Sequence, residues 1–215
     1  MSSKAVRNGS EDGRPRRALV LWLGLAAALG LSFALDGPVM AAVRPIHDSH
    51  FADLVGTTIR WLGTGYVQGP LPLIMLACGA LWSSRLRGAG LSTLLAFVTS
   101  VVAVSVLKVI VHRPRPWVTD APPAQWSGYL HDSHFHSFPS AESTTTFAVA
   151  LTIGAWYPGL RAPLVVLAGL VAIGRVIVGA HHPSDVVAGA ILGLAVSGLF
   201  TARAARAQES PVDGS

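Results

Sequence analysis

Residues 91–116, LSTLLAFVTSVVAVSVLKVIVHRPRP, contain the pattern on which the fold prediction rests. The first part, Leu91–Val111, is an apolar run with one charged residue, Lys108, close to its end. A helix needs about 20 apolar residues to cross the ~30 Å hydrocarbon core of a bilayer. The run therefore predicts a membrane-spanning helix that ends beside a cluster of basic residues and prolines.

The composition of the whole chain agrees with a membrane protein. Of 215 residues, 51% are hydrophobic and only 13% are charged, whereas soluble domains carry roughly 25% charged residues. This excludes a disordered chain and a small soluble globule. The length allows one domain. The single cysteine, Cys78, excludes a disulfide framework and a cysteine-based zinc site.

Five more apolar segments accompany the first, and together they predict an all-α bundle of six transmembrane helices. They are Ala18–Leu35, Tyr66–Trp82, Ser143–Trp156, Pro163–Val178 and Val186–Ala202. The last three are short for a bilayer, which indicates helices whose ends line a cavity enclosed by protein.

The first apolar segment has two interpretations. A basic start followed by an apolar run is typical of a signal peptide, but no small-residue cleavage site follows, which favours a retained span. We interpret Asp36-Gly37-Pro38 as the end of its helix. In the mixed loop that follows, Phe51–Leu62 is a candidate interfacial helix.

The basic residues predict the domain limits and the orientation. Residues 1–17 are expected to be a disordered basic cytoplasmic tail, 18–203 the transmembrane domain and 204–215 a disordered cytoplasmic tail. Much of the net charge of +5 lies in the first tail, so we expect no nucleic-acid partner. The positive-inside rule places both termini in the cytoplasm. Most basic residues then lie on that side, namely Lys4, Arg7, Arg14, Arg16, Arg17, Arg85, Arg87, Arg161, Arg203 and Arg206.

Three polar segments interrupt the apolar background, and this topology places all three at the extracytoplasmic face. The segments are 108–116, 138–144 and 174–185. Ionisable groups near a membrane are costly and therefore mark functional sites. Lys108, Arg115 and Arg175 form a cationic cluster, and a tetrahedral phosphate suits the fork of an arginine.

The remaining polar residues complete a site that attacks phosphorus. Pro139-Ser140 is typical of a helix start, where a hydroxyl and free N–H groups bind phosphate oxygens. His181 and Asp185 are four residues apart and share a face if the helix has begun by His181. Asp185 then orients the imidazole, whose other nitrogen attacks the phosphate and forms a phosphohistidine.

Each feature also has a purely structural interpretation. Lys108 can be a snorkelling lysine, Arg113–Pro116 a loop that contacts lipid headgroups, and His181-His182-Pro183 a helix cap. Glu142 can be an ordinary helix-start residue. The coincidence of all these features at one membrane face favours a joint site.

The spacing resembles the signature of type 2 phosphatidic acid phosphatases, which are related to vanadium haloperoxidases. The resemblance rests on Lys108-x6-Arg115-Pro116, Pro139-Ser140 and Arg175-x5-His181-x3-Asp185, and covers about residues 60–203. It implies a six-span bundle that removes phosphate from a lipid without a metal or cofactor. Transferred position by position, it implies phosphate binding by Lys108, Arg115, Ser140 and Arg175, with His181 as nucleophile and Asp185 as its orienting partner.

Two positions depart from the family pattern. Gly174 stands where the family usually has serine, which removes at most a hydroxyl. Glu142 stands where the family has the histidine that protonates the leaving oxygen. Glu142 can act as that acid only if it is protonated before transfer, so rate, substrate and activity depend on this position.

The loop His131-Asp132-Ser133-His134-Phe135-His136 has three interpretations. Its histidines can bind a metal, can be solvated, or can supply the missing acid through His134 or His136. The solvated interpretation is favoured, and no metal is expected.

The predicted function is a lipid phosphatase of a bacterial inner membrane with its active site facing the exterior. Phosphatidate, phosphatidylglycerophosphate, an isoprenyl diphosphate and lipid A are all candidate substrates. The alternatives are a phosphotransferase that uses the same site, and a catalytically weak lipid-phosphate-binding protein. The sequence does not predict the oligomeric state.

Overall fold

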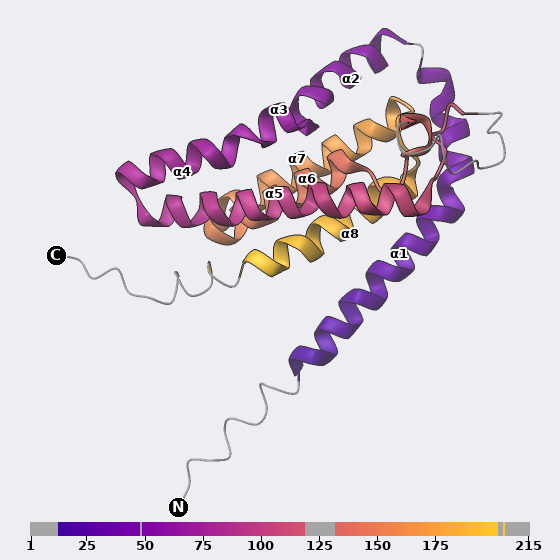
Figure 1. Ribbon diagram of the computed structural model, residues 1–215. Helices are drawn as coiled ribbons and strands as arrows, with labels where there is room; N and C mark the ends of the chain where they lie inside the picture. Colours follow the sequence, from indigo (N-terminus) through magenta and orange to yellow (C-terminus); the bar gives the residue numbers. More distant parts are fainter. Residues whose placement is uncertain (1–12, 48, 119–131, 202–203, 205–215) are drawn as a thin grey trace, which may run out of the picture.

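The computed structural model describes residues 13–47, 49–118, 132–201 and 204, and this part is entirely helical (Figure 1). This confirms the all-α class. The helices are α1 (Gly13–Val43), α2 (His50–Gly63), α3 (Gly65–Gln68), α4 (Pro70–Trp82), α5 (Ser84–Val111), α6 (Ala141–Trp156), α7 (Pro158–Ile177) and α8 (Pro183–Phe200), with short 3-10 turns η1 (Arg44–Ile46) and η2 (Ser133–Phe135).

The structure contains fewer clear candidates for membrane-spanning helices than the predicted six. In the described part of the chain, four helical segments are long and apolar enough to cross a bilayer, namely Arg16–Ile46, α5, α7 and α8. A fifth span results if α2 and α3 are joined with α4, across a bend of 47°. Pro70 begins α4 at this bend, and α6 is only 16 residues long. The count of six is therefore not confirmed.

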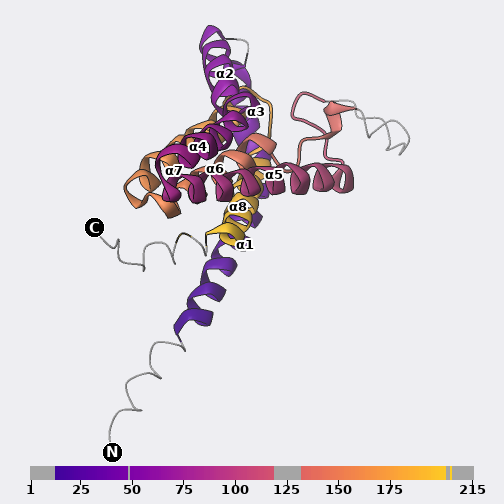
Figure 2. The same ribbon diagram turned by 60° about the vertical axis from the view of Figure 1, so that its left-hand side comes forward.

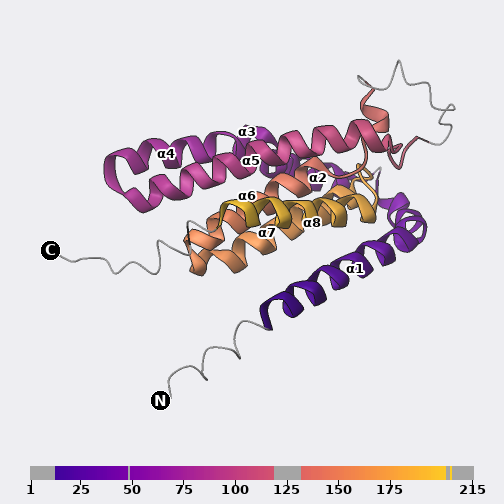
Figure 3. The same ribbon diagram turned by 60° about the horizontal axis from the view of Figure 1, so that its bottom comes forward.

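Helix α6 lies at the centre of the bundle, beside α7 and α8 (Figure 3). It is rich in hydroxyl side chains, and those of Thr144, Thr145 and Thr146 bond to carbonyls one turn earlier in the helix. These internal bonds allow a polar helix to be buried, because every buried hydroxyl needs a partner.

Two glycines of α8 allow this close packing. A Cβ at Gly189 would lie 2.8 Å from the Ser140 carbonyl, and one at Gly193 would lie 2.6 Å from the Thr144 carbonyl. Small residues four apart let two membrane helices approach backbone to backbone. The approach brings the start of α8 against the start of α6, where the polar motifs lie.

Helix α1 is longer than predicted at both ends. It begins at Gly13, inside the segment expected to be a tail, and continues through Asp36-Gly37-Pro38 to Val43. The predicted helix end was therefore wrong. Membrane helices tolerate an internal proline when neighbouring groups satisfy the freed backbone, and Asp36 itself is bound to the start of α8. The first half of α1 projects away from the bundle (Figure 2).

Helix α2 contains the predicted interfacial segment Phe51–Leu62 and packs against α7. At their contact, a Cβ at Gly174 would lie 1.7 Å from Cδ1 of Ile59. A serine in place of Gly174 would force Ile59 to move. The departure from the family pattern therefore accompanies the close approach of α2 to the site.

Candidate phosphate-binding and catalytic site

Four helix ends meet at one end of the bundle and bring the three sequence motifs together (Figure 1). Lys108 is in the last turn of α5 and Arg175 in the last turn of α7. Glu142 and Asp185 are in the first turns of α6 and α8. The sequence predicted that these residues share one face, and the structure places them at one end.

His181 lies just before α8 and is completely buried. Its Nδ1 is 2.9 Å from the carbonyl oxygen of Ser137 and 3.7 Å from Oδ2 of Asp185. The carbonyl can only accept, so it selects the tautomer with the proton on Nδ1. Nε2 is buried without a hydrogen bond in the described structure. In this tautomer the neutral imidazole has its lone pair on Nε2, as a nucleophile requires.

Asp185 supports His181 through Ser137 rather than by a direct short contact. Oδ2 of Asp185 accepts a 2.6 Å hydrogen bond from the Ser137 hydroxyl and a 2.8 Å bond from the His182 N–H. Oδ1 lies 2.7 Å from Nη1 of Arg113. The helix begins at Pro183 rather than by His181, so Asp185 caps its own helix start.

Asp36 and Arg113 belong to the same network, and sequence reasoning missed both. Nη2 of Arg113 lies 2.6 Å from Oδ2 of Asp36, and the guanidinium stacks on the Phe33 ring. Asp36 also accepts hydrogen bonds from the Ser184 N–H at 2.8 Å and the Ser184 hydroxyl at 2.6 Å. One signal was present: an acid within an apolar segment is costly unless it is paired.

Glu142 faces the nucleophile directly. Its Oε1 lies 3.1 Å from Nη2 of Arg175, and its Oε2 lies 3.4 Å from Nε2 of His181. The carboxylate therefore lies between a phosphate-binding candidate and the attacking nitrogen. Nε of Arg175 is buried and has no hydrogen bond in the described structure, so the guanidinium has a donor left for a further anion.

The other predicted phosphate ligands surround this centre but bind protein groups. Lys108 donates to the carbonyl of His136, and Arg115 donates to the carbonyls of Ser133 and Ala180. The Ala180 contact, at 3.1 Å, places the Arg115 guanidinium beside the residue that directly precedes His181. The buried Ser140 hydroxyl accepts the N–H of Ser143 and so caps α6.

The histidine-rich loop is described in part, and His131 lies outside the described residues. Asp132 accepts the N–H of His134 at 3.0 Å, and its carboxylate also contacts the His134 ring. The His134 N–H and ring hold the pKa of Asp132 below its ordinary value. No group of three or more metal-ligating side chains occurs among the residues that the structure covers.

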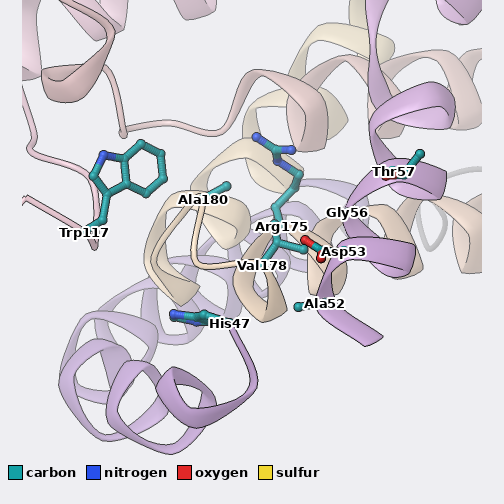
Figure 4. A pocket seen from close by; sticks show the side chains of 9 residues that line it. All are labelled: His47, Ala52, Asp53, Gly56, Thr57, Trp117, Arg175, Val178 and Ala180. Atoms are coloured by element: carbon teal, nitrogen blue, oxygen red, sulfur yellow. The ribbon is translucent and has the colours of Figure 1, made fainter. Parts of the chain in front are cut away.

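Two cavities adjoin each other near the site, and Figure 4 shows the inner one, which Arg175 lines. The inner cavity, about 310 Å³, is lined by His47, Ala52, Asp53, Gly56, Thr57, Trp117, Arg175, Val178 and Ala180. The outer cavity, about 580 Å³, shares His47, Trp117 and Val178 with it and adds Met40, Ala41, Arg44, Pro116 and Gly179. Among the phosphate-binding candidates, Arg175 lines the inner cavity, which lies beside residues of α2 and the site loops.

Comparison with known proteins identifies the family. The PAP2 superfamily model matches residues 89–209. Decaprenylphosphoryl-5-phosphoribose phosphatase of Mycobacterium tuberculosis is 38% identical over 192 residues, which cover 86% of this chain and 89% of that protein. Lipid A 1-phosphatase of Rhizobium johnstonii is 28% identical over 182 residues, which cover 80% of this chain and 75% of that protein.

Comparison with solved structures also finds a membrane phosphatase. The PAP2-type phosphatidylglycerolphosphate phosphatase of Bacillus subtilis superposes with a TM-score of 0.68 at 27% identity, covering 92% of this chain and 98% of that one. LpxE of Aquifex aeolicus gives 0.56 at 25% identity, covering 74% and 92%. Lipid phosphatases therefore recur among the relatives. The chain belongs to the PAP2 superfamily.

Proposed function

We propose that this protein hydrolyses a phosphate monoester of a membrane lipid through a phosphohistidine on His181. The observation that carries the proposal is the position of Nε2: it is buried, lacks a hydrogen bond in the described structure, and faces the Glu142–Arg175 ion pair. The lipid phosphatases among its relatives support the substrate class.

In the first step, Nε2 of His181 attacks phosphorus and the bond from phosphorus to the lipid oxygen breaks. Two groups stabilise the imidazolium that forms. The Ser137 carbonyl accepts a hydrogen bond from Nδ1–H, and Asp185 is a nearby carboxylate. Arg175 exchanges the carboxylate of Glu142 for phosphate oxygens. Arg115, Lys108 and Ser140 complete the phosphate-binding group, with no metal or cofactor required.

Glu142 carries the proton in both steps. A carboxylate in an ion pair has no proton to give, so the substrate must bring one as the phosphate monoanion. That proton passes to Glu142 and from there to the departing lipid oxygen. In the second step Glu142 removes a proton from water, whose oxygen attacks phosphorus as the bond to Nε2 breaks. The lipid alcohol has left with the proton that the substrate brought, and Glu142 returns the proton from water to inorganic phosphate, which leaves as the monoanion.

The membrane arrangement follows from the basic residues and remains part of the proposal. Both termini lie in the cytoplasm, and the site faces the exterior of a bacterial inner membrane. Six crossings are needed for this, so α6 must count as a span despite its 16 residues. Its burial among α5, α7 and α8 supports this, because a helix surrounded by protein needs less apolar length.

One observation favours a second function, the binding of lipid phosphate without turnover. The ion pair of Glu142 with Arg175 occupies the place that the phosphate must take. If phosphate does not displace Glu142 from Arg175, the cationic pocket can still bind a lipid phosphate but does not hydrolyse it. Transfer to an acceptor hydroxyl instead of water would use the same first step.

Release of inorganic phosphate from a panel of lipid phosphates by the purified full-length protein distinguishes these functions. We expect release by the wild type and none by His181→Ala, with both proteins folded. Phosphate transferred to an added alcohol would indicate phosphotransfer. Saturable binding with no release from any lipid would favour the binding protein and contradict hydrolysis.

A further inference from the structure

We propose that the two adjoining cavities select a lipid with three polar parts in order: a phosphomonoester, a hydroxyl-bearing linker and a phosphodiester. This inference rests on the proposed function and deepens it. It favours glycerol- or sugar-linked lipid phosphates over phosphatidate and isoprenyl diphosphates, which lack such a linker.

The first part is set by Arg175, which belongs to both the catalytic group and the inner cavity. A phosphomonoester bound there has its lipid oxygen directed away from His181, because the leaving oxygen lies opposite the attacking atom. The proposal places the rest of the headgroup in the space next to Arg175. The inner cavity, of about 310 Å³, is next to that residue.

The second part is set by the lining of the inner cavity. Asp53 and Thr57, one turn apart on α2, line it together with the ring of Trp117 from the opposite side (Figure 4). A carboxylate accepts hydrogen bonds from hydroxyl groups and repels a second phosphate attached directly to the first. Asp53 therefore favours a neutral, hydroxylated linker over a diphosphate.

The third part is set by the outer cavity. The charged residues differ between the cavities, because the acid Asp53 lines only the inner cavity and the cation Arg44 lines only the outer one, while His47 lines both. The His47 ring also packs on Gly179: a Cβ at Gly179 would lie 2.8 Å from it, and the residue has a left-handed φ of 68°. The cation Arg44 suits the single negative charge of a phosphodiester.

An apolar surface continues from the outer cavity. Met40 and Ala41 of α1 line it, and Leu35 and Leu31 lie further back on the same helix with 43% and 62% of their surface exposed. This surface suits the lipid chains. Arg175, Asp53, Arg44 and the apolar part of α1 follow one another along this path. They match, in the same order, the phosphomonoester, the hydroxyl-bearing linker, the phosphodiester and the hydrocarbon tail.

The test compares kcat/KM of the purified full-length protein on four detergent-dispersed lipids. Phosphatidylglycerol phosphate has a glycerol linker, a polyprenylphosphoryl phosphoribose has a ribose linker, and phosphatidate and an isoprenyl diphosphate have none. We expect one or both linker lipids to exceed the other two by about 10-fold or more, since a hydrogen bond to a charged group changes binding by this order. The linker lipid with the higher kcat/KM shows whether the natural linker is glycerol or a sugar.

The variants are Arg44→Ala and Asp53→Asn, with Arg87→Ala as the control, which removes an exposed charge outside both cavities. Arg44→Ala should lower kcat/KM for the linker lipids about 10-fold and leave phosphatidate within about twofold. Asp53→Asn should lower the ratio of linker lipid to diphosphate. Equal losses on every lipid, no loss, or a wild-type preference for phosphatidate would overturn the inference.

A binding measurement separates this inference from the proposed function. The His181→Ala protein should bind phosphatidylglycerol phosphate more tightly than phosphatidate, and Arg44→Ala in that background should remove the difference. If the wild type releases no phosphate but this preference is present, hydrolysis is wrong and the cavity assignment is right. If release occurs and the preference is absent, the cavity assignment is wrong.

Discussion

Arg113 and Asp185 form an ion pair of 2.7 Å that connects the candidate catalytic group to the first helix. The other end of the same guanidinium binds Asp36 of α1 at 2.6 Å. Asp36 also holds the Ser184 N–H at the start of α8. Helix α1, half of which projects from the bundle, therefore positions the residues on either side of the nucleophile.

Asp36→Asn should reduce turnover without blocking substrate binding. The amide keeps the size of the side chain but loses the charge that holds Arg113, and residues that orient an active group typically matter by 10- to 100-fold. We expect kcat to fall within that range while KM changes little. Steady-state kinetics on a lipid phosphate measure this, with Arg87→Ala as the exposed control. A change in KM alone, or no change, would contradict a positioning role.

Glu142→Gln should slow turnover by about 10² to 10⁴, the usual range for proton transfer by a side chain. Phosphate binding should persist, because the ion pair that competes for Arg175 is weakened. Substrates with an acidic leaving group should lose least. The measurements are kcat and the affinity for inorganic phosphate.

Glu142→His is the companion variant because it restores the family pattern. It should raise activity on a monoester lipid. If Glu142→Gln leaves kcat unchanged and Glu142→His is inactive, the proton comes from another group. His134→Ala and His136→Ala would then be the next variants.

The contact between α6 and α8 should tolerate no side chain at Gly193. Gly193→Ala places a Cβ 2.6 Å from the Thr144 carbonyl, and overpacking of this kind costs about 1–3 kcal/mol. Gly198→Ala on the same helix meets nothing within 4 Å and should be stabilising through helix propensity. Thermal unfolding in detergent compares the two. Equal melting temperatures would show that the helices do not meet at Gly193.

The orientation of the bundle predicts where reporters become active. A reporter fused after Ser215 should report the cytoplasm, and one inserted near Ala124 should report the exterior. Chemical labelling of single cysteines placed at the same positions provides an independent control. The reverse pattern would move the site to the cytoplasmic face, and termini on opposite sides would indicate an odd number of spans.

The sequence was sufficient to predict which residues meet, because the motifs lie at the ends of consecutive apolar segments. Alternation of helix direction then places the residues at 108, 142, 175 and 185 at one end of the bundle. It was also sufficient to recognise Glu142 as an unusual residue. The fold class followed from composition and hydrophobic run length alone.

Contacts between distant segments could not be predicted in this way. Asp36 and Ser184 are 148 residues apart, and no local periodicity relates them. Asp36-Gly37-Pro38 has the composition of a helix end, but tertiary bonds to α8 and Arg113 allow the helix to continue. The carbonyl of Ser137 that holds His181 was missed because backbone groups carry no sequence signature. The count of six spans stays unconfirmed at α6, because its 16 residues are few for a span and the sequence does not show that α5, α7 and α8 surround it.

The central claim is that His181 becomes phosphorylated. Rapid mixing of the full-length protein with a lipid carrying a radiolabelled phosphate, followed by a denaturing quench, measures label bound to the protein. The wild type should show an acid-labile, base-stable phosphoprotein within one turnover, as expected for phosphohistidine, and Asp185→Asn should form it more slowly. His181→Ala should bind the lipid and retain no label. Label retained by folded His181→Ala, or hydrolysis without any phosphoprotein in the wild type, would contradict this mechanism.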